Sequence, residues 1–133
     1  MMTMNLDNPA GIAIHSYVPG MVTLKAHSEK AGANRLINCQ SSLIVTMQEV
    51  MEGWPPQCID ELEGHHFDEV WRRKPELVLL GSGENFRFPA ATLMVQFAEV
   101  GIGFEVMDTA AACRTYNILT AEGRDVMALL LLN

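Results

Sequence analysis

The sequence has few of the residues that build metal sites and disulfide frameworks. It contains three cysteines and four histidines in 133 residues, with no C-x-x-C or H-x-x-x-H spacing. An odd number of widely spaced cysteines argues against a disulfide framework and indicates reduced thiols. The adjacent His65 and His66 would diverge by about 100° on a helix, so they would not share an ion easily. We therefore expect no metal and no cofactor.

Positive charge and long apolar runs are also scarce. The 9 Lys and Arg residues against 16 Asp and Glu residues give a net charge of −7, which opposes binding to nucleic-acid phosphates. The longest apolar run, residues 126–132, is far too short to span a bilayer. The N-terminus has no basic start followed by an apolar stretch, as a signal peptide would. We expect a cytoplasmic protein with no transmembrane segment and no nucleic-acid partner.

What is present indicates one folded domain over residues 1–133. Hydrophobic residues make up 49% of the chain and charged residues 19%, which excludes disorder as the main state. We expect residues 1–10 to be flexible, residues 11–60 to be mainly β, and residues 61–133 to alternate between helix and strand.

The first half reads as short strands. Apolar residues alternate on both sides of a Pro19-Gly20 turn: Ile12 and Ile14 before it, and Val22, Leu24 and Ala26 after it. Residues 43–45 predict another strand, residues 27–35 a polar loop, and residues 47–53 either a helical turn or a loop. The Trp54-Pro55-Pro56 segment excludes regular structure because proline lacks a donor and restricts its predecessor.

The second half begins with a helix and a buried strand. Phe67 and Trp71 are four residues apart, so they share one helix face, and Pro75 ends that helix. Cations in its last turn, at residues 72–74, suit the helix dipole and indicate a solvated helix end. The continuous apolar run of residues 77–80 is typical of a strand covered on both sides.

Two more helices and two more strands follow. Pro89 suits the first turn of a helix that ends at Gly101, with a buried stripe of Leu93, Phe97 and Val100. Residues 104–107 predict a strand. Asp108 or Thr109 is expected to cap a third helix, which Gly123 ends. Residues 126–132 are apolar on both faces and predict a central strand. Together these elements predict layered α/β packing.

The Gly81-Ser82-Gly83 turn invites three functional interpretations, and none has a complete motif. A dinucleotide fingerprint needs a third glycine where Phe86 stands, although Asp108 imitates the ribose-binding acid. A Walker loop needs a lysine after the glycines, and none is present. A nucleophile elbow places its glycines one residue further from the serine and its histidine later in the chain, whereas all four histidines precede Ser82. A tight exit from a buried strand explains the glycines better.

Two segments carry a family resemblance: ELVLLGSGENFRF and VGIGFEVMDTAAACRTYNILTAEGRDVMALLL. They resemble the family that contains assembly factor 3 of the mitochondrial respiratory complex I (NADH:ubiquinone oxidoreductase) and many small bacterial and archaeal domains. The matching motifs are Gly81-Ser82-Gly83, Gly101-Ile102, Glu105-Val106, Asp108-Thr109, Ala112, Tyr116-Asn117 and Glu122-Gly123-Arg124. The resemblance is strong over residues 75–132 and thinner over residues 12–74, where Trp54 and the Phe67/Trp71 helix fit.

The resemblance implies a three-layer α/β domain with a mixed central sheet, helices packed on it, and a small additional antiparallel β layer. It implies no established activity, because the best understood member is a chaperone-like assembly factor. The leading hypothesis is a non-catalytic protein-interaction domain for respiratory complex I or for the biogenesis of another membrane complex. The alternatives are a small-molecule or nucleotide-binding module at the glycine turn and, with least support, a small hydrolase.

Any functional surface is expected at the carboxyl ends of strands 77–80 and 104–107, which should be parallel. There Ser82, Gly83 and Arg87 would lie beside Asp108 and Thr109, with free backbone N–H groups for an anion or a partner's carboxylate. The competing surfaces are the helix end at residues 72–74 and the N-terminal hairpin.

Further predictions concern the glycine turn and the third helix. Gly83 should have a positive φ or a close backbone neighbour. Asn117 should bond the 81–83 turn or line a pocket with Tyr116, Trp54 and Ser82.

Overall fold

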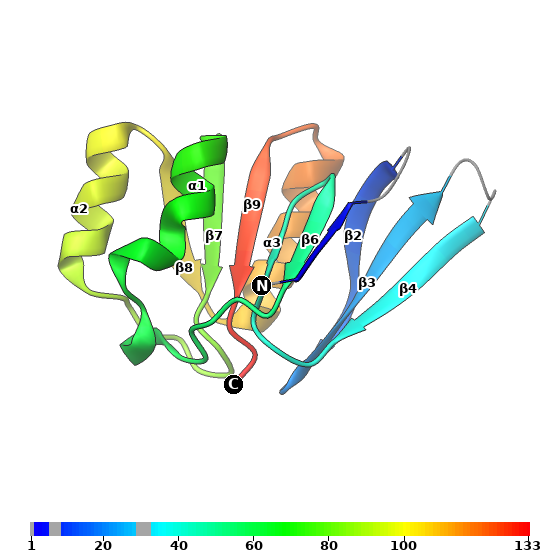
Figure 1. Cartoon of the computed structure of the whole chain (residues 1–133), viewed down its shortest axis with the longest axis horizontal. Coiled ribbons are helices and arrows are strands. Elements are labelled where there is room, and N and C mark those ends of the chain that lie inside the picture. The colour runs from blue at the N-terminus through cyan, green and yellow to red at the C-terminus, as the bar shows by residue number, and fades with distance from the viewer. Residues whose placement is uncertain (1, 6–8, 29–32) are drawn as a thin grey trace.

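A computed structural model describes residues 2–5, 9–28 and 33–133, and the side chains of residues 11–27 and 33–133. In this part of the chain a six-stranded mixed sheet forms the middle layer, as Figure 1 shows. Its strand order is β1 (Met2–Asn5), β6 (Glu49–Glu52), β5 (Leu43–Val45), β9 (Val126–Leu130), β7 (Leu77–Gly81) and β8 (Gly103–Met107). β7 is parallel to β8 and β9, and the remaining pairs are antiparallel. The prediction that strands 77–80 and 104–107 are parallel is therefore confirmed.

Helices and a second sheet cover the two faces of the middle layer. The short helix α1 (Asp68–Arg73) and α2 (Ala91–Val100) lie on one face, after the 3-10 turns η1 (Ile59–Glu61) and η2 (Gly64–Phe67). The other face carries α3 (Thr109–Ala121) and an antiparallel sheet of β2 (Pro9–Val18), β3 (Met21–Ser28) and β4 (Ala33–Cys39). This arrangement confirms the three-layer α/β fold with its additional β layer.

Alternation along the central strands divides the buried side chains into two cores. Leu77, Leu79 and Ala128 point into the core shared with α3 and the small sheet. Val78, Leu80 and Leu129 point into the core under α1 and α2. Because successive side chains of a strand face opposite sides, a strand covered on both faces is apolar at every position. This explains why residues 77–80 and 126–130 read as continuous apolar runs.

Most predicted boundaries in the second half are confirmed. Asp108 is the N-cap of α3 and accepts a 2.8 Å hydrogen bond from the Ala111 backbone N–H. Gly101, at φ +74°, ends α2, and Gly123, at φ +83°, follows the end of α3. Pro89 lies just outside α2, which begins at Ala91.

The buried stripe of α2 is shorter than predicted. Leu93 and Phe97 are buried, but Val100 is 57% exposed. Val100 is the last helical residue, and α2 lies over β8, which is one of the two edge strands of the sheet. The final turn of the helix therefore faces solvent where the sheet ends.

Two predictions in the first half are wrong where the structure describes them. The segment that we expect to be flexible, residues 1–10, includes strand β1 and the start of β2, and residues 1 and 6–8 lie outside the described residues, so its flexibility stays a prediction. The expected loop at residues 27–35 is largely strand at both ends, and residues 29–32 lie outside the described part. Residues 49–52 form strand β6 instead of a helical turn or loop, because they pair with β1 and β5.

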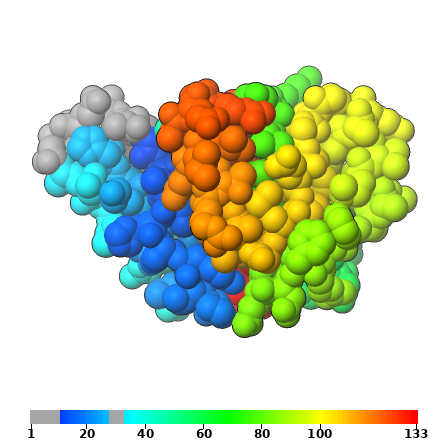
Figure 2. All heavy atoms as spheres, turned by 180° about the vertical axis from the view of Figure 1, so that it is seen from behind, coloured from blue at the N-terminus to red at the C-terminus, as the bar shows by residue number. Residues whose placement is uncertain are grey.

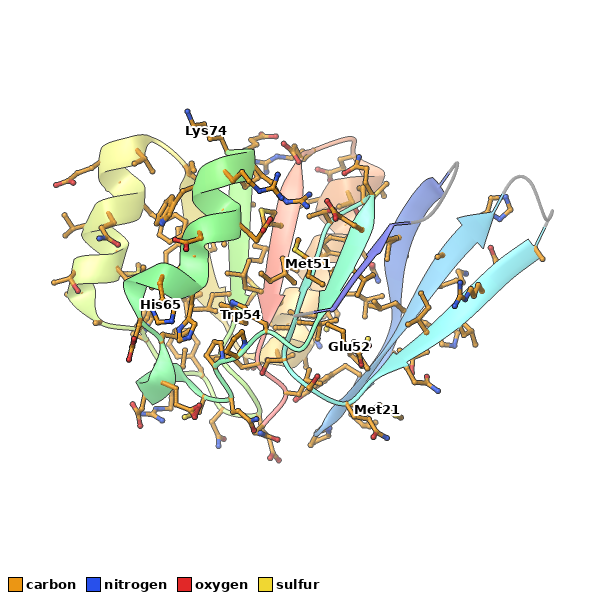
Figure 3. All side chains as sticks on the ribbon, in the orientation of Figure 1. Met21, Met51, Glu52, Trp54, His65 and Lys74 are labelled. Atoms are coloured by element: carbon orange, nitrogen blue, oxygen red, sulfur yellow. The ribbon has the colours of Figure 1, made fainter. Side chains whose placement is uncertain are left out.

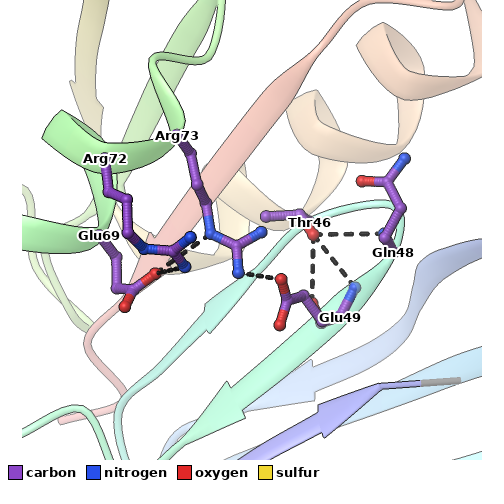
Figure 4. A network of polar contacts seen from close by, with 6 residues as sticks. All are labelled: Thr46, Gln48, Glu49, Glu69, Arg72 and Arg73. Atoms are coloured by element: carbon purple, nitrogen blue, oxygen red, sulfur yellow. Dashed lines mark hydrogen bonds and ion pairs between the residues drawn. The ribbon is translucent and has the colours of Figure 1, made fainter.

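The cationic end of α1 is less solvated than predicted. Figure 4 shows the Arg73 guanidinium bridging Glu69 of α1 and Glu49 of β6, with its side chain only 19% exposed. Thr46 holds the turn before β6, because its hydroxyl oxygen accepts hydrogen bonds from the backbone N–H groups of Gln48 and Glu49. Arg73 thus fastens α1 to the sheet, and Arg72 lies exposed beside Glu69.

Candidate functional site

The Gly81-Ser82-Gly83 turn lies at the carboxyl end of β7, beside the start of α3, as predicted. The Ser82 backbone N–H donates to the carbonyl oxygen of Met107 at 2.8 Å. Gly83 exchanges two bonds with Thr109: its N–H donates to Thr109 Oγ1 at 2.8 Å, and its carbonyl accepts from the Thr109 N–H at 2.9 Å. The two loops are therefore joined directly to each other.

The chain's own last residues fill the crevice that was expected between these loops. Thr109 is fully buried, and its hydroxyl donates to the carbonyl oxygen of Leu131. The Leu131 N–H donates to the Gly81 carbonyl at 3.0 Å. Gly83 has φ +105°, and a Cβ added there would overlap the backbone oxygen of Asn133, so its predicted conformation and close neighbour are both confirmed.

At three positions of the two loops, the expectation of free backbone N–H groups is therefore wrong. The N–H groups of Ser82, Gly83 and Thr109 all have partners inside the protein. The next helix, α2, begins at Ala91, too far along the chain for its N-terminus to complete a phosphate loop. Asp108, the proposed imitation of a ribose-binding acid, caps α3 instead.

The Ser82 hydroxyl also forms its hydrogen bonds within its own loop. Its side chain is buried, and its hydroxyl donates to the Asn85 carbonyl at 2.7 Å and accepts from the Arg87 N–H at 3.1 Å. No histidine is among these partners. The hydroxyl therefore shapes residues 82–87 into a compact turn.

Tyr116 and Asn117 lie on α3, away from the glycine turn, and their side chains contact the edge strand β2. The Asn117 side chain accepts from the Ile14 N–H and donates to the Ile14 carbonyl, both at 2.8 Å. The buried Tyr116 hydroxyl donates to the Ile12 carbonyl at 2.7 Å. Burial raises the pKa of Tyr116, so the phenol keeps its proton. The predicted bond from Asn117 to the 81–83 turn is wrong, because both the oxygen and the nitrogen of its amide are hydrogen-bonded to the backbone of Ile14 at the edge of β2.

Trp54 lies on the opposite face of the sheet from Tyr116. It packs in the core under α1 and α2, and its indole N–H donates to the His66 carbonyl at 2.9 Å. Figure 3 shows Trp54 near His65, on the side of the sheet that α1 covers. A pocket lined jointly by Trp54, Tyr116, Asn117 and Ser82 is therefore excluded by the six-stranded sheet between them.

Arg87 lies between two exposed phenylalanines that the sequence analysis did not identify as a candidate site. Its guanidinium pairs with Asp60 of η1 at 2.8 Å, and both side chains are exposed. On either side of it, Phe86 and Phe88 are 52% and 65% exposed, and their rings meet edge to face with centroids 4.8 Å apart. We call residues 84–88 the aromatic loop. The two phenylalanines of the F-R-F spacing, in the loop between Gly83 and Pro89, were the available signal, since exposed large apolar side chains that lie together are informative.

Other candidate chemistry finds little support in the described residues. Across residues 2–5, 9–28 and 33–133, no three His, Cys, Asp or Glu side chains gather as a metal site would require. Burial raises the pKa of the Cys113 thiol to about 12 and that of Cys39 to about 12, so both stay protonated at neutral pH. In the same part of the chain, no helix has the length and apolar character needed to cross a membrane.

Comparison with known sequences shows the family. The family described as "Protein of unknown function (DUF498/DUF598)" matches residues 14–131, and the chain belongs to it. A relative from Francisella tularensis subsp. holarctica, named "13 kDa major membrane protein", is 32% identical over 73 residues, which are 55% of this chain and 59% of that protein. The chain thus spans less than two thirds of that relative's length.

Solved structures share the whole fold. A crystal structure from Bordetella parapertussis has a TM-score of 0.78 and 26% identity, covering 96% of this chain and 100% of that one. An NMR structure from Xanthomonas campestris has a TM-score of 0.76 and 29% identity, covering 97% and 91%. A Bartonella henselae protein described as an outer membrane protein has a TM-score of 0.72 and 25% identity, covering 92% and 95%.

Proposed function

We propose that this member of the DUF498/DUF598 family is a non-catalytic protein-interaction domain that docks a partner on its aromatic loop. The observation that carries the proposal is the exposed pair Phe86 and Phe88 on an otherwise tightly bonded loop. Removing a large apolar side chain from water contributes about 1.5–3 kcal/mol. Exposed aromatic rings are therefore the side chains from which a partner gains most.

The loop is already ordered for binding. Ser82 bonds the backbone at Asn85 and Arg87, and the Arg87 guanidinium pairs with Asp60. Gly83 and Thr109 join the base of the loop to α3. A surface held in one conformation loses less entropy when a partner binds. In Figure 2 the light-green atoms of this segment form part of the lower edge of the molecule, where a partner can reach them.

The chemistry of the same region supports binding over catalysis. The Ser82 hydroxyl is held by two backbone groups, and the Cys113 thiol is neutral because burial raises its pKa to about 12. A nucleophile needs an adjacent base or a lowered pKa. The nucleotide-binding alternative lacks the free N–H groups at Ser82 and Gly83 that would hold a phosphate, so we expect no rise in melting temperature with nucleotides.

The finer proposal is an assembly-factor-like role at a membrane complex, with respiratory complex I as the first candidate. Sequence resemblance to the complex I assembly factor family supports it, and so does the Francisella relative's name, "13 kDa major membrane protein". The net charge of −7 disfavours direct attachment to anionic lipid and favours a protein partner that is itself in the membrane. We propose that the chain acts from the cytoplasmic side of that membrane.

Affinity purification of the tagged chain from its native cells tests the proposal. The test variant carries Phe86→Ser and Phe88→Ser, and the matched control carries Val95→Ser and Val100→Ser, which removes two exposed apolar side chains from α2. We expect a defined partner with the native chain and the control, and its loss with the test variant. Equal recovery with all three would refute docking on the aromatic loop. Identification of the partner as a respiratory subunit would support the finer proposal, and a partner unrelated to any membrane complex would contradict it.

A further inference from the structure

A hollow of about 190 Å³ opens between the edge strand β2 and the first turns of α3. Its lining includes His15, Ser16 and Tyr17 from β2 and Ala110, Cys113 and Arg114 from α3. Figure 2 shows these two elements side by side, β2 in blue and α3 in orange. The volume is smaller than the 300–1,000 Å³ typical of drug-sized ligand pockets, so the hollow suits a small group.

The framework around the hollow is rigid. The paired bonds between Asn117 and Ile14, with the bond from Tyr116 to Ile12, tie α3 to β2 at one end. The pairing of β2 with β3 shifts register between Ile14 and Ser16, which is a β-bulge at His15. A bulge locally re-aims side chains, and bulges are frequent beside functional sites. The backbone on both sides of the hollow is therefore held by hydrogen bonds and shaped by the bulge.

Several polar side chains of the lining have no partner. Within the described residues, the side chains of Arg114, His15 and Ser16 form no ion pair or hydrogen bond, whereas the Asn117 amide is bonded to Ile14. The Tyr17 hydroxyl is buried there without a partner. No lining residue is acidic, although the chain has 16 Asp and Glu residues. A guanidinium with unused donors is the preferred partner of a carboxylate.

The charges nearby determine which end an anion takes. Burial raises the pKa of Tyr17, and Cys113, Glu84 and Asp108 raise it further. The two carboxylates among these groups, Glu84 and Asp108, therefore lie toward the Tyr17 end of the hollow. The Cys113 thiol is neutral, since burial raises its pKa to about 12, and it offers an apolar wall with Ala110. An anion would therefore sit at the Arg114 and His15 end, and its apolar part would lie against Cys113, Ala110 and the Tyr17 ring.

We propose that the β2–α3 hollow binds a carboxylate group carried on a short apolar chain, with Arg114 as its charged partner. The carboxylate comes either from a free short-chain acid or from an acidic side chain or C-terminus of a peptide. This inference does not depend on docking at the aromatic loop.

The test is a titration followed by two-dimensional NMR of the intact chain, with hexanoate as the free acid. A short apolar peptide with a free C-terminus is the second probe, and hexylamine is the cationic counterpart. We expect hexanoate or the peptide to shift the amide signals of residues 14–17 and 110–117, and hexylamine to leave them in place. Shifts with only one of the two carboxylates identify its source. Shifts with neither, or equal shifts with hexylamine, overturn the proposal.

Two variants assign the interaction. Arg114→Gln keeps a hydrogen-bonding side chain on the surface but removes the charge, and we expect about tenfold weaker binding, or about 1.4 kcal/mol. Ala110→Leu should block the hollow and abolish the shifts. The control is Arg72→Gln, an exposed arginine on α1, which should bind as the native chain does. Unchanged affinity in Arg114→Gln, with an unchanged melting temperature, would overturn the assignment.

Discussion

Gly83 is the residue on which the closed turn after β7 depends most. Its φ of +105° is strained for any other residue, and a Cβ would overlap the Asn133 carbonyl oxygen. We expect Gly83→Ala to lower the free energy of unfolding by at least about 1 kcal/mol more than Gly101→Ala. Gly101 is the matched control, because it also has a positive φ, +74°, but has open space around it. Its alanine variant therefore bears only the backbone strain of the left-handed conformation, about 1–2 kcal/mol. Urea denaturation measures the free energy of unfolding of both variants. Equal decreases would show that Asn133 moves aside without an energetic cost.

Thr109 joins three segments through one hydroxyl. It donates to the Leu131 carbonyl and accepts from the Gly83 N–H in a fully buried position. Thr109→Val keeps the shape but leaves both backbone groups unpaired, and an unsatisfied buried polar group costs about 1–3 kcal/mol. Thr92→Val on the exposed start of α2 is the control and should change stability little. A thermal melt that finds the two variants equally stable would refute the central role of this hydroxyl.

At the scale of the elements, the turn η2 depends on an unprotonated histidine. His66 Nδ1 accepts a 3.0 Å hydrogen bond from the Glu63 N–H, a bond that protonation of that nitrogen would break. Burial lowers the pKa of His66 below its ordinary value of 6.5, and His65 lowers it further, despite the opposing effect of Glu63 and Glu61.

The sign of the pH dependence follows from this shift. Below about pH 6.5 the unfolded chain takes up the proton more readily than the folded chain, so stability falls as the pH falls through this value. We expect His66→Gln to show a weaker fall than the native chain, and His65→Gln to lie between the two, because burial lowers the pKa of His66 more than His65 does. Melting temperatures measured across this pH range check the prediction, and parallel curves for all three proteins would contradict it.

The elements also show what the sequence could and could not predict. The second half was largely predictable, because a strand covered on both faces must be apolar and because Asp108, Gly101 and Gly123 mark helix ends chemically. Strand β6 was not predictable, since residues 49–52 become a strand only by pairing with β1 and β5. The partners of Asn117 and Trp54 were equally hidden, because sequence spacing does not reveal which side of a sheet a helix or loop will cover.

At the scale of the whole molecule, the six-stranded sheet carries both cores. β7 and β9 are buried at every position, whereas β4 is one of the two outer strands of the small sheet and β8 one of the two outer strands of the large sheet. We expect amide hydrogen exchange to be slowest in β7 and β9 and faster in β4 and β8, because local opening is easiest where few buried contacts must break. Faster exchange in β9 than in β4 would contradict a single fold built around the shared sheet.

The central claim is that the aromatic loop is the partner-binding surface, and site-specific photo-crosslinking in native cells tests it most directly. A benzophenone-bearing amino acid replaces Phe88 in one chain and Val100 in another, two exposed positions on separate segments. The proposed function predicts a discrete crosslinked adduct from position 88 and none from position 100. Adding Phe86→Ser to the chain with the crosslinker at position 88 should weaken that adduct. Adducts from position 100 with none from position 88 would contradict it and place the interaction surface on α2.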